Sequence, residues 1–109
     1  MGKLHNRELI GLLKKLRENI EKEFSLERMI LFGSRAKDEW LLTSDVDLIL
    51  VSRDFHGIPF RHRMKRIIEF WDEDVGLTAL CYTPAEFEEM KSQIGIVSQA
   101  LREGVEIKS

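Results

Sequence analysis

The chain reads Met29-Ile30-Leu31-Phe32-Gly33-Ser34 and, after ten further residues, Asp45-Val46-Asp47-Leu48-Ile49-Leu50-Val51. Both stretches contain a short apolar run of the length and composition of a buried strand. Gly33 ends the first run, as expected where a strand passes into a tight turn. The sequence therefore predicts two neighbouring strands, at residues 29–32 and 45–51, with a short helical stretch between them at about residues 37–41.

The polar residues at the ends of these strands indicate chemistry on phosphate. Side chains alternate along a strand, so the carboxylates of Asp45 and Asp47 are expected on one face, roughly 6–7 Å apart. Mg²⁺ binds one or two carboxylates and completes its shell with water and phosphate oxygens. Gly33 allows close approach of the backbone to a phosphate. The N–H groups and hydroxyl at Ser34 can hold that phosphate, and Arg35 can add positive charge.

Each motif also has a plainer interpretation. Gly-Ser is a common loop, and Asp-x-Asp before a strand can be a turn and a cap. However, Asp47 directly precedes an apolar run, and an ionised carboxylate entering a core strand is costly without a partner. The two motifs together therefore favour a site for Mg²⁺ and a nucleoside triphosphate.

The remaining pattern predicts helices and two further strands. An apolar stripe at spacings of three and four predicts a first helix over residues 7–24; its members are Leu9, Leu13, Leu16, Ile20 and Phe24. Further helices are expected at residues 60–71, 84–92 and 96–102, and strands at residues 77–82 and 105–107. Thr83-Pro84-Ala85-Glu86 has the pattern of a capping box. The fold class is therefore α/β (α+β), one domain over residues 1–109, with helices packed on a small mixed β-sheet.

Two motifs carry a resemblance to a known family. Gly33-Ser34-Arg35-Ala36 followed by Ser44-Asp45-Val46-Asp47-Leu48 resembles the signature of the DNA polymerase beta-like nucleotidyltransferase superfamily, and within it the minimal nucleotidyltransferase (MNT) branch. The resemblance implies that Ser34 holds the triphosphate and that Asp45 and Asp47 bind Mg²⁺ and are catalytic. The family usually adds a third carboxylate on the next strand. By register from Thr83-Pro84 that position falls near Thr78, and the nearest acids, at residues 72–74, lie before the strand.

The resemblance also implies an activity and a partner. The expected reaction is transfer of a nucleotide, AMP from ATP, to an acceptor hydroxyl. MNT proteins often pair with a HEPN-domain protein and act as its antitoxin, so a HEPN-like partner in a homo- or hetero-oligomer is expected here. The alternative is a catalytically weak or inactive nucleotide-binding module that neutralises the partner by contact.

The composition argues against several other classes of protein. The net charge of −2 does not support bulk binding of nucleic acid. Cys81 is the single cysteine, which excludes a disulfide within the chain and favours a reducing, cytoplasmic setting. Residues 1–9 carry no long apolar stretch, and no apolar run approaches the ~20 residues that span a bilayer, so no membrane partner is expected.

The third helix region carries a basic cluster, which consists of Arg61, His62, Arg63, Lys65 and Arg66. We interpret this cluster as a solvated helix face; the alternative is contact with the nucleotide or a nucleic acid. The three histidines show no metal-ligand spacing, so zinc is not expected. Cys81 and the aromatic residues, including Trp71, are expected to pack in the core.

Overall fold

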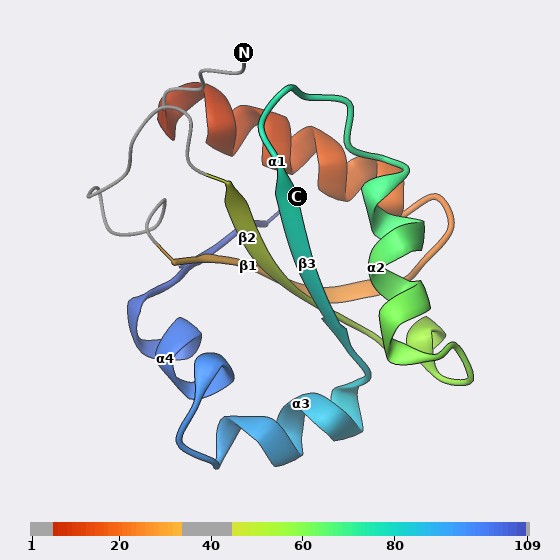
Figure 1. Cartoon of the computed structure of the whole chain (residues 1–109), viewed down its shortest axis with the longest axis vertical. Helices are drawn as coiled ribbons and strands as arrows, with labels where there is room; N and C mark the ends of the chain where they lie inside the picture. Colours follow the sequence, from red (N-terminus) through yellow and green to blue (C-terminus); the bar gives the residue numbers. More distant parts are fainter. Residues whose placement is uncertain (1–5, 34–44, 109) are drawn as a thin grey trace.

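The computed structural model describes residues 6–33 and 45–108, which form a four-stranded mixed sheet (Figure 1). The strand order is β3-β2-β1-β4. The strands are β1 (Leu26–Phe32), β2 (Val46–Ser52), β3 (Leu77–Tyr82) and β4 (Val105–Glu106). β1 is antiparallel to both β2 and β4, whereas β2 and β3 are parallel. The predicted mixed sheet is confirmed, including the short strand β4 at its edge. The predicted helical stretch at residues 37–41 lies outside the described residues.

Helices cover both faces of the sheet, because alternate residues of the central strands pack in opposite directions. On one face, Leu48 and Leu50 of β2 join a core cluster with the predicted apolar stripe of α1 (Asn6–Ile20). On the other, Ile49 joins a second cluster with residues of α3 (Pro84–Lys91) and α4 (Ile96–Glu103). In Figure 1, α1 crosses above the sheet, and α3 and α4 lie below it. Asp47 alternates with Leu48, so its side chain belongs to the α3–α4 face.

The first helix ends before its predicted end. α1 ends at Ile20 rather than at residue 24, because the chain turns there toward β1. Phe24 is still buried, and its ring centroid lies 5.2 Å from that of Phe55. Phe55 belongs to a 3-10 turn, η2 (Arg53–Phe55), which directly follows β2. The apolar stripe was therefore read correctly, although its last member lies in a turn rather than in the helix.

The basic cluster on α2 (Phe60–Ile68) is only partly a solvated face, because Arg63 is buried. Its Nε donates to the carbonyl oxygen of Ile58 at 2.8 Å, and Nη1 donates to that of Cys81 at 3.1 Å. Nη1 also pairs with the Glu86 carboxylate at 2.6 Å. The prediction of a solvated basic face was wrong for Arg63, because its acceptors on Cys81 and Glu86 are available only once β3 and α3 have packed beside α2.

The packing of α2 leaves two of its large apolar side chains exposed, including Phe60, one of the aromatic residues that were expected to pack in the core. Phe60 is 47% exposed and Ile68 is 38% exposed, whereas Ile67 is fully buried. The helix ends at Ile68, three residues before the predicted end. Trp71 lies beyond the helix and packs against the larger core cluster, while its indole Nε1 donates to the carbonyl oxygen of Val75 at 2.8 Å.

Glu86 both caps the start of α3 and forms an ion pair with Arg63. Its backbone N–H donates to the Thr83 hydroxyl at 3.2 Å, and its carboxylate accepts from the backbone N–H of Thr83 at 2.9 Å. This is the predicted capping box at the start of α3. The hydrogen bond from Arg63, together with its charge, lowers the pKa of the Glu86 carboxyl against the opposing effect of burial. Arg63 therefore ties α2, β3 and α3 together around this cap.

Substituting Arg63 tests this junction. Arg63→Met keeps most of the side-chain volume but leaves buried carbonyl groups without their donor, so we expect a loss of about 3 kcal/mol in the free energy of unfolding. For a domain of this size that loss lowers Tm by about 12 °C or more. Thermal unfolding measures the effect, with Arg61→Met as the exposed control, which should stay within about 0.5 kcal/mol of the native chain. Equal melting of both variants would contradict the assigned role.

Cys81 lies in the core, as predicted, and is 1% exposed. Burial raises the pKa of its thiol to about 12, so the thiol stays protonated at neutral pH. None of the helices in the described part of the chain combines the length and apolar character that crossing a membrane requires.

Candidate functional site

The strand register brings the sequence-predicted residues together at one end of the sheet. Phe32, the last residue of β1, pairs with Asp47, and Gly33 follows directly. On its other side Asp47 pairs with Thr78 of β3. The position predicted for the third carboxylate therefore lies beside Asp47, as the register from Thr83-Pro84 indicated, and it holds threonine. Ser34 and Arg35 lie outside the described residues.

Both the backbone conformation and the neighbouring Asp47 side chain require glycine at position 33. Its φ of 78° lies in the left-handed region, which side chains other than glycine adopt at a cost. A Cβ atom at this position would lie 2.6 Å from Oδ2 of Asp47, closer than real Cβ contacts allow. The Asp47 carboxylate therefore lies directly against the backbone of Gly33.

Asp45 lies just outside the strand that was predicted to contain it. β2 begins at Val46, whose N–H donates to the carbonyl oxygen of Gly76 at 2.9 Å. The Asp45 carboxylate lies against Gly76, where a Cβ atom would be 2.7 Å from Oδ1. The sequence did not identify Gly76, because a glycine before a strand is read as an ordinary turn residue.

Both carboxylates lie close enough to interact. Burial raises the pKa of Asp47, and the neighbouring charge of Asp45 raises it further. Within residues 6–33 and 45–108, no basic side chain forms an ion pair with either acid. The pair thus carries negative charge that a cation would relieve, which fits the chemistry of a Mg²⁺ site.

No third acid completes a cluster in the described part of the chain. There, no three His, Cys, Asp or Glu side chains come together in a way that could hold a metal ion. Two carboxylates alone still fit Mg²⁺, which takes its remaining ligands from water and substrate phosphates. The third carboxylate that the resemblance implies has no counterpart among these residues, because its expected position holds Thr78.

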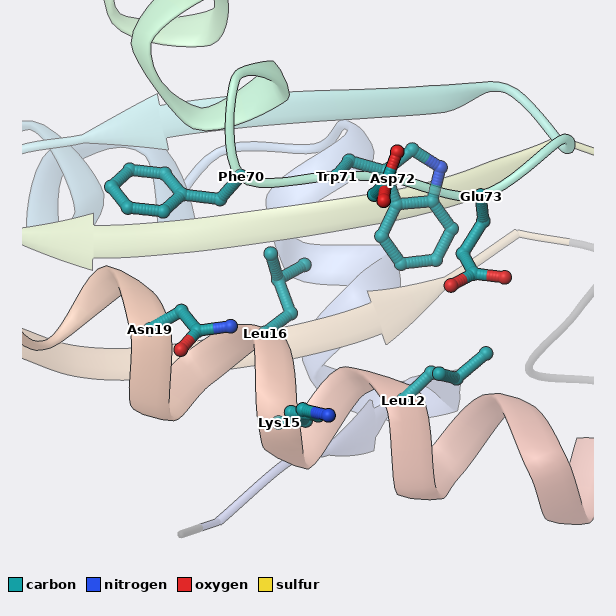
Figure 2. Close-up of a pocket in the computed structure, with 8 residues that line it drawn as sticks. All are labelled: Leu12, Lys15, Leu16, Asn19, Phe70, Trp71, Asp72 and Glu73. Carbon is teal, nitrogen blue, oxygen red and sulfur yellow. The ribbon is translucent and has the colours of Figure 1, made fainter.

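Two of the loop acids line a separate cavity. Asp72 and Glu73 border a space of about 250 Å³ between α1 and the segment after α2 (Figure 2). Its other lining residues include Lys15 of α1 and Trp71, and Figure 2 shows the Glu73 side chain extending toward α1. Because α1 covers the sheet face opposite to Asp47, this arrangement disfavours Asp72 and Glu73 as replacements for the third carboxylate.

The comparisons with known proteins agree with this fold. The model of the nucleotidyltransferase domain family matches residues 13–105, and the chain belongs to that family. Among solved structures, it is similar to a Sulfolobus solfataricus protein assigned only provisionally as a nucleotidyltransferase. The two share 24% identity and a TM-score of 0.65, over 97% of this chain and 89% of the other, which shows a common fold. None of the curated proteins matches. The family predicted from the sequence is confirmed.

Proposed function

We propose that this domain binds Mg²⁺-ATP at Gly33, Ser34, Asp45 and Asp47 and transfers AMP to an acceptor hydroxyl. The observation that carries the proposal is a pair of interacting carboxylates, with Asp47 lying against the left-handed Gly33 and Asp45 lying against Gly76. Membership of the nucleotidyltransferase domain family supports a transferase. Mg²⁺, ATP and the acceptor are our own assignment from these residues and from the resemblance to MNT proteins.

The roles of the residues follow from their chemistry. Gly33 lets the backbone reach the phosphates, while the Ser34 hydroxyl donates a hydrogen bond to them and Arg35 adds charge. Asp45 and Asp47 hold Mg²⁺, which supplies charge stabilisation to the phosphates when it is bound. In the transfer, the acceptor oxygen bonds to the α-phosphorus and the bond to pyrophosphate breaks. The proton of the acceptor hydroxyl passes to water, because the Thr78 hydroxyl beside Asp47 does not take up a proton as a carboxylate does.

The threonine at position 78 supports a second candidate function, that of a nucleotide-binding module with little or no catalytic activity. A threonine hydroxyl can orient an acceptor but does not take up its proton as a carboxylate does. We therefore retain the alternative that the domain is a catalytically weak or inactive nucleotide-binding module. In that case it neutralises its partner by contact rather than by modification.

We further propose that the acceptor is a partner protein of HEPN type, with this chain as its antitoxin in the cytoplasm. The support is the resemblance to MNT proteins at Gly33-Ser34-Arg35-Ala36 and Ser44-Asp45-Val46-Asp47-Leu48. The test is transfer of label from α-³²P-ATP to the purified partner. Labelled partner supports the enzyme. Neutralisation without label supports the binding module. The absence of both labelling and neutralisation would refute the assignment of this partner.

Ser34 offers a test of phosphate binding. Ser34→Ala removes one hydrogen bond to a charged phosphate, which contributes about 1.5–3 kcal/mol. We expect ATP affinity to fall by about 10–100-fold, with adenosine affinity unchanged, when both are measured by calorimetry with Mg²⁺. Unchanged ATP affinity would return Ser34 to an ordinary turn residue.

A further inference from the structure

We infer that Gly76 is a positioning residue for Asp45: the absence of a side chain at residue 76 places the Asp45 carboxylate for metal binding. This inference rests on the proposed function. A Cβ atom at residue 76 would lie 2.7 Å from Oδ1, 3.1 Å from Cγ and 3.4 Å from Oδ2 of Asp45. The whole carboxylate therefore lies over the glycine, and no side chain fits there while Asp45 keeps its present position.

The need for glycine at this position is one of space rather than backbone conformation. Among the described glycines only Gly33 and Gly57 have φ in the left-handed region, so the backbone at Gly76 is open to other residues. The nearest atoms to the added Cβ all belong to the Asp45 side chain. Position 76 is therefore restricted by the carboxylate itself.

If a side chain were added at residue 76, the Asp45 carboxylate would move rather than the backbone. Asp45 is exposed, so its side chain can rotate into solvent. The backbone is held by the hydrogen bond from Val46 to Gly76 and by the pairing of Val46 with Leu77. A side chain at residue 76 should thus displace the carboxylate from its place near Asp47 while the strands remain paired.

A metal titration with matched alanine variants tests the inference. Mn²⁺ prefers the same oxygen ligands as Mg²⁺ and can be followed by electron paramagnetic resonance. Gly76→Ala should weaken Mn²⁺ binding by about 10–100-fold, the usual effect of disturbing the residues that orient a ligand. Gly95→Ala is the control, because a Cβ there meets nothing within 4 Å. Native Mn²⁺ affinity in Gly76→Ala would overturn the inference.

A metal-free measurement separates this inference from the proposed function. The χ1 rotamer population of Asp45, obtained from three-bond NMR couplings, should change in Gly76→Ala and stay native in Gly95→Ala. An unchanged Asp45 rotamer would overturn the inference even if metal binds. Conversely, a native chain that binds no Mn²⁺ would refute the proposed function, and the rotamer would still decide the role of Gly76.

A double variant covers the case in which Gly76→Ala does not fold. Asp45→Ala removes the carboxylate that a Cβ at residue 76 would meet. If Gly76→Ala unfolds the native chain but is tolerated in the Asp45→Ala background, the collision with the carboxylate is the cause. If the double variant also fails to fold, glycine is needed for the backbone and the inference is wrong.

Discussion

Replacing Asp45 and Asp47 together by asparagine should remove the Mg²⁺-dependent part of ATP binding and abolish transfer. Asparagine keeps the shape of each side chain but lacks the charge that a hard divalent cation requires. Disturbing residues that merely orient metal ligands costs about 10–100-fold in affinity. Loss of both ligands should cost at least about 100-fold. Calorimetric titration of ATP with and without Mg²⁺ measures the difference.

The matched control neutralises two acids elsewhere. Asp72→Asn with Glu73→Gln makes the same change in net charge at the cavity beside α1, whose lining residues include neither Asp45 nor Asp47. ATP affinity and its dependence on Mg²⁺ should stay native in this variant. Equal Mg²⁺-dependent affinity in the native chain and in the Asp45/Asp47 variant would refute the site.

The Asp45/Asp47 variant should also fold at least as well as the native chain without metal. Burial and Asp45 raise the pKa of Asp47, so the folded state holds this proton at a pH where the unfolded chain has lost it. The contribution of Asp47 to the free energy of unfolding is therefore complete below the pKa that it has in the unfolded chain. This contribution is lost as pH rises through the pKa that Asp47 has in the folded state. Asp47→Asn should gain stability relative to the native chain over that rise. Chemical unfolding at several pH values, without divalent cations, measures the gain, which Mg²⁺ should reduce.

Restoring a carboxylate at residue 78 should raise transfer. Thr78 pairs directly with Asp47 in the parallel register, so an aspartate there would lie beside the existing pair. General acid–base help of this kind typically contributes about 10²–10⁴-fold in rate. We therefore expect Thr78→Asp to increase AMP transfer to a suitable acceptor by that order. Thr78→Asn, which has the same size without the charge, should give no increase.

The alternative source of a base is an acid in the loop before β3. If Asp72, Glu73 or Asp74 served, neutralising that one residue would abolish a measurable native activity, and Thr78→Asp would add nothing. Such a result would contradict the role assigned to position 78. A third carboxylate would also increase repulsion in the metal-free protein, so Thr78→Asp should be less stable without Mg²⁺ and should recover when Mg²⁺ is added.

Most of the fold followed from local patterns in the sequence. The apolar stripe of α1, the strand β3 at residues 77–82 and the capping box at Thr83 and Glu86 were all predicted, and each has its cause within a few residues of chain. The start of α3 also fixes the end of β3 and so places Thr78 within that strand. Periodicity and capping are short-range properties, so a single sequence reveals them.

Tertiary packing decided the features that the sequence did not reveal. Arg63 stands among exposed basic residues, and it is buried because β3 and α3 supply its acceptors. Gly76 looks like a turn residue, and the Asp45 carboxylate lies on it only because β2 and β3 pair. The sequence by itself indicated the nucleotidyltransferase family and the four strands. The position of each carboxylate and the burial of Arg63 depend on contacts between distant segments, which exist only in the folded chain.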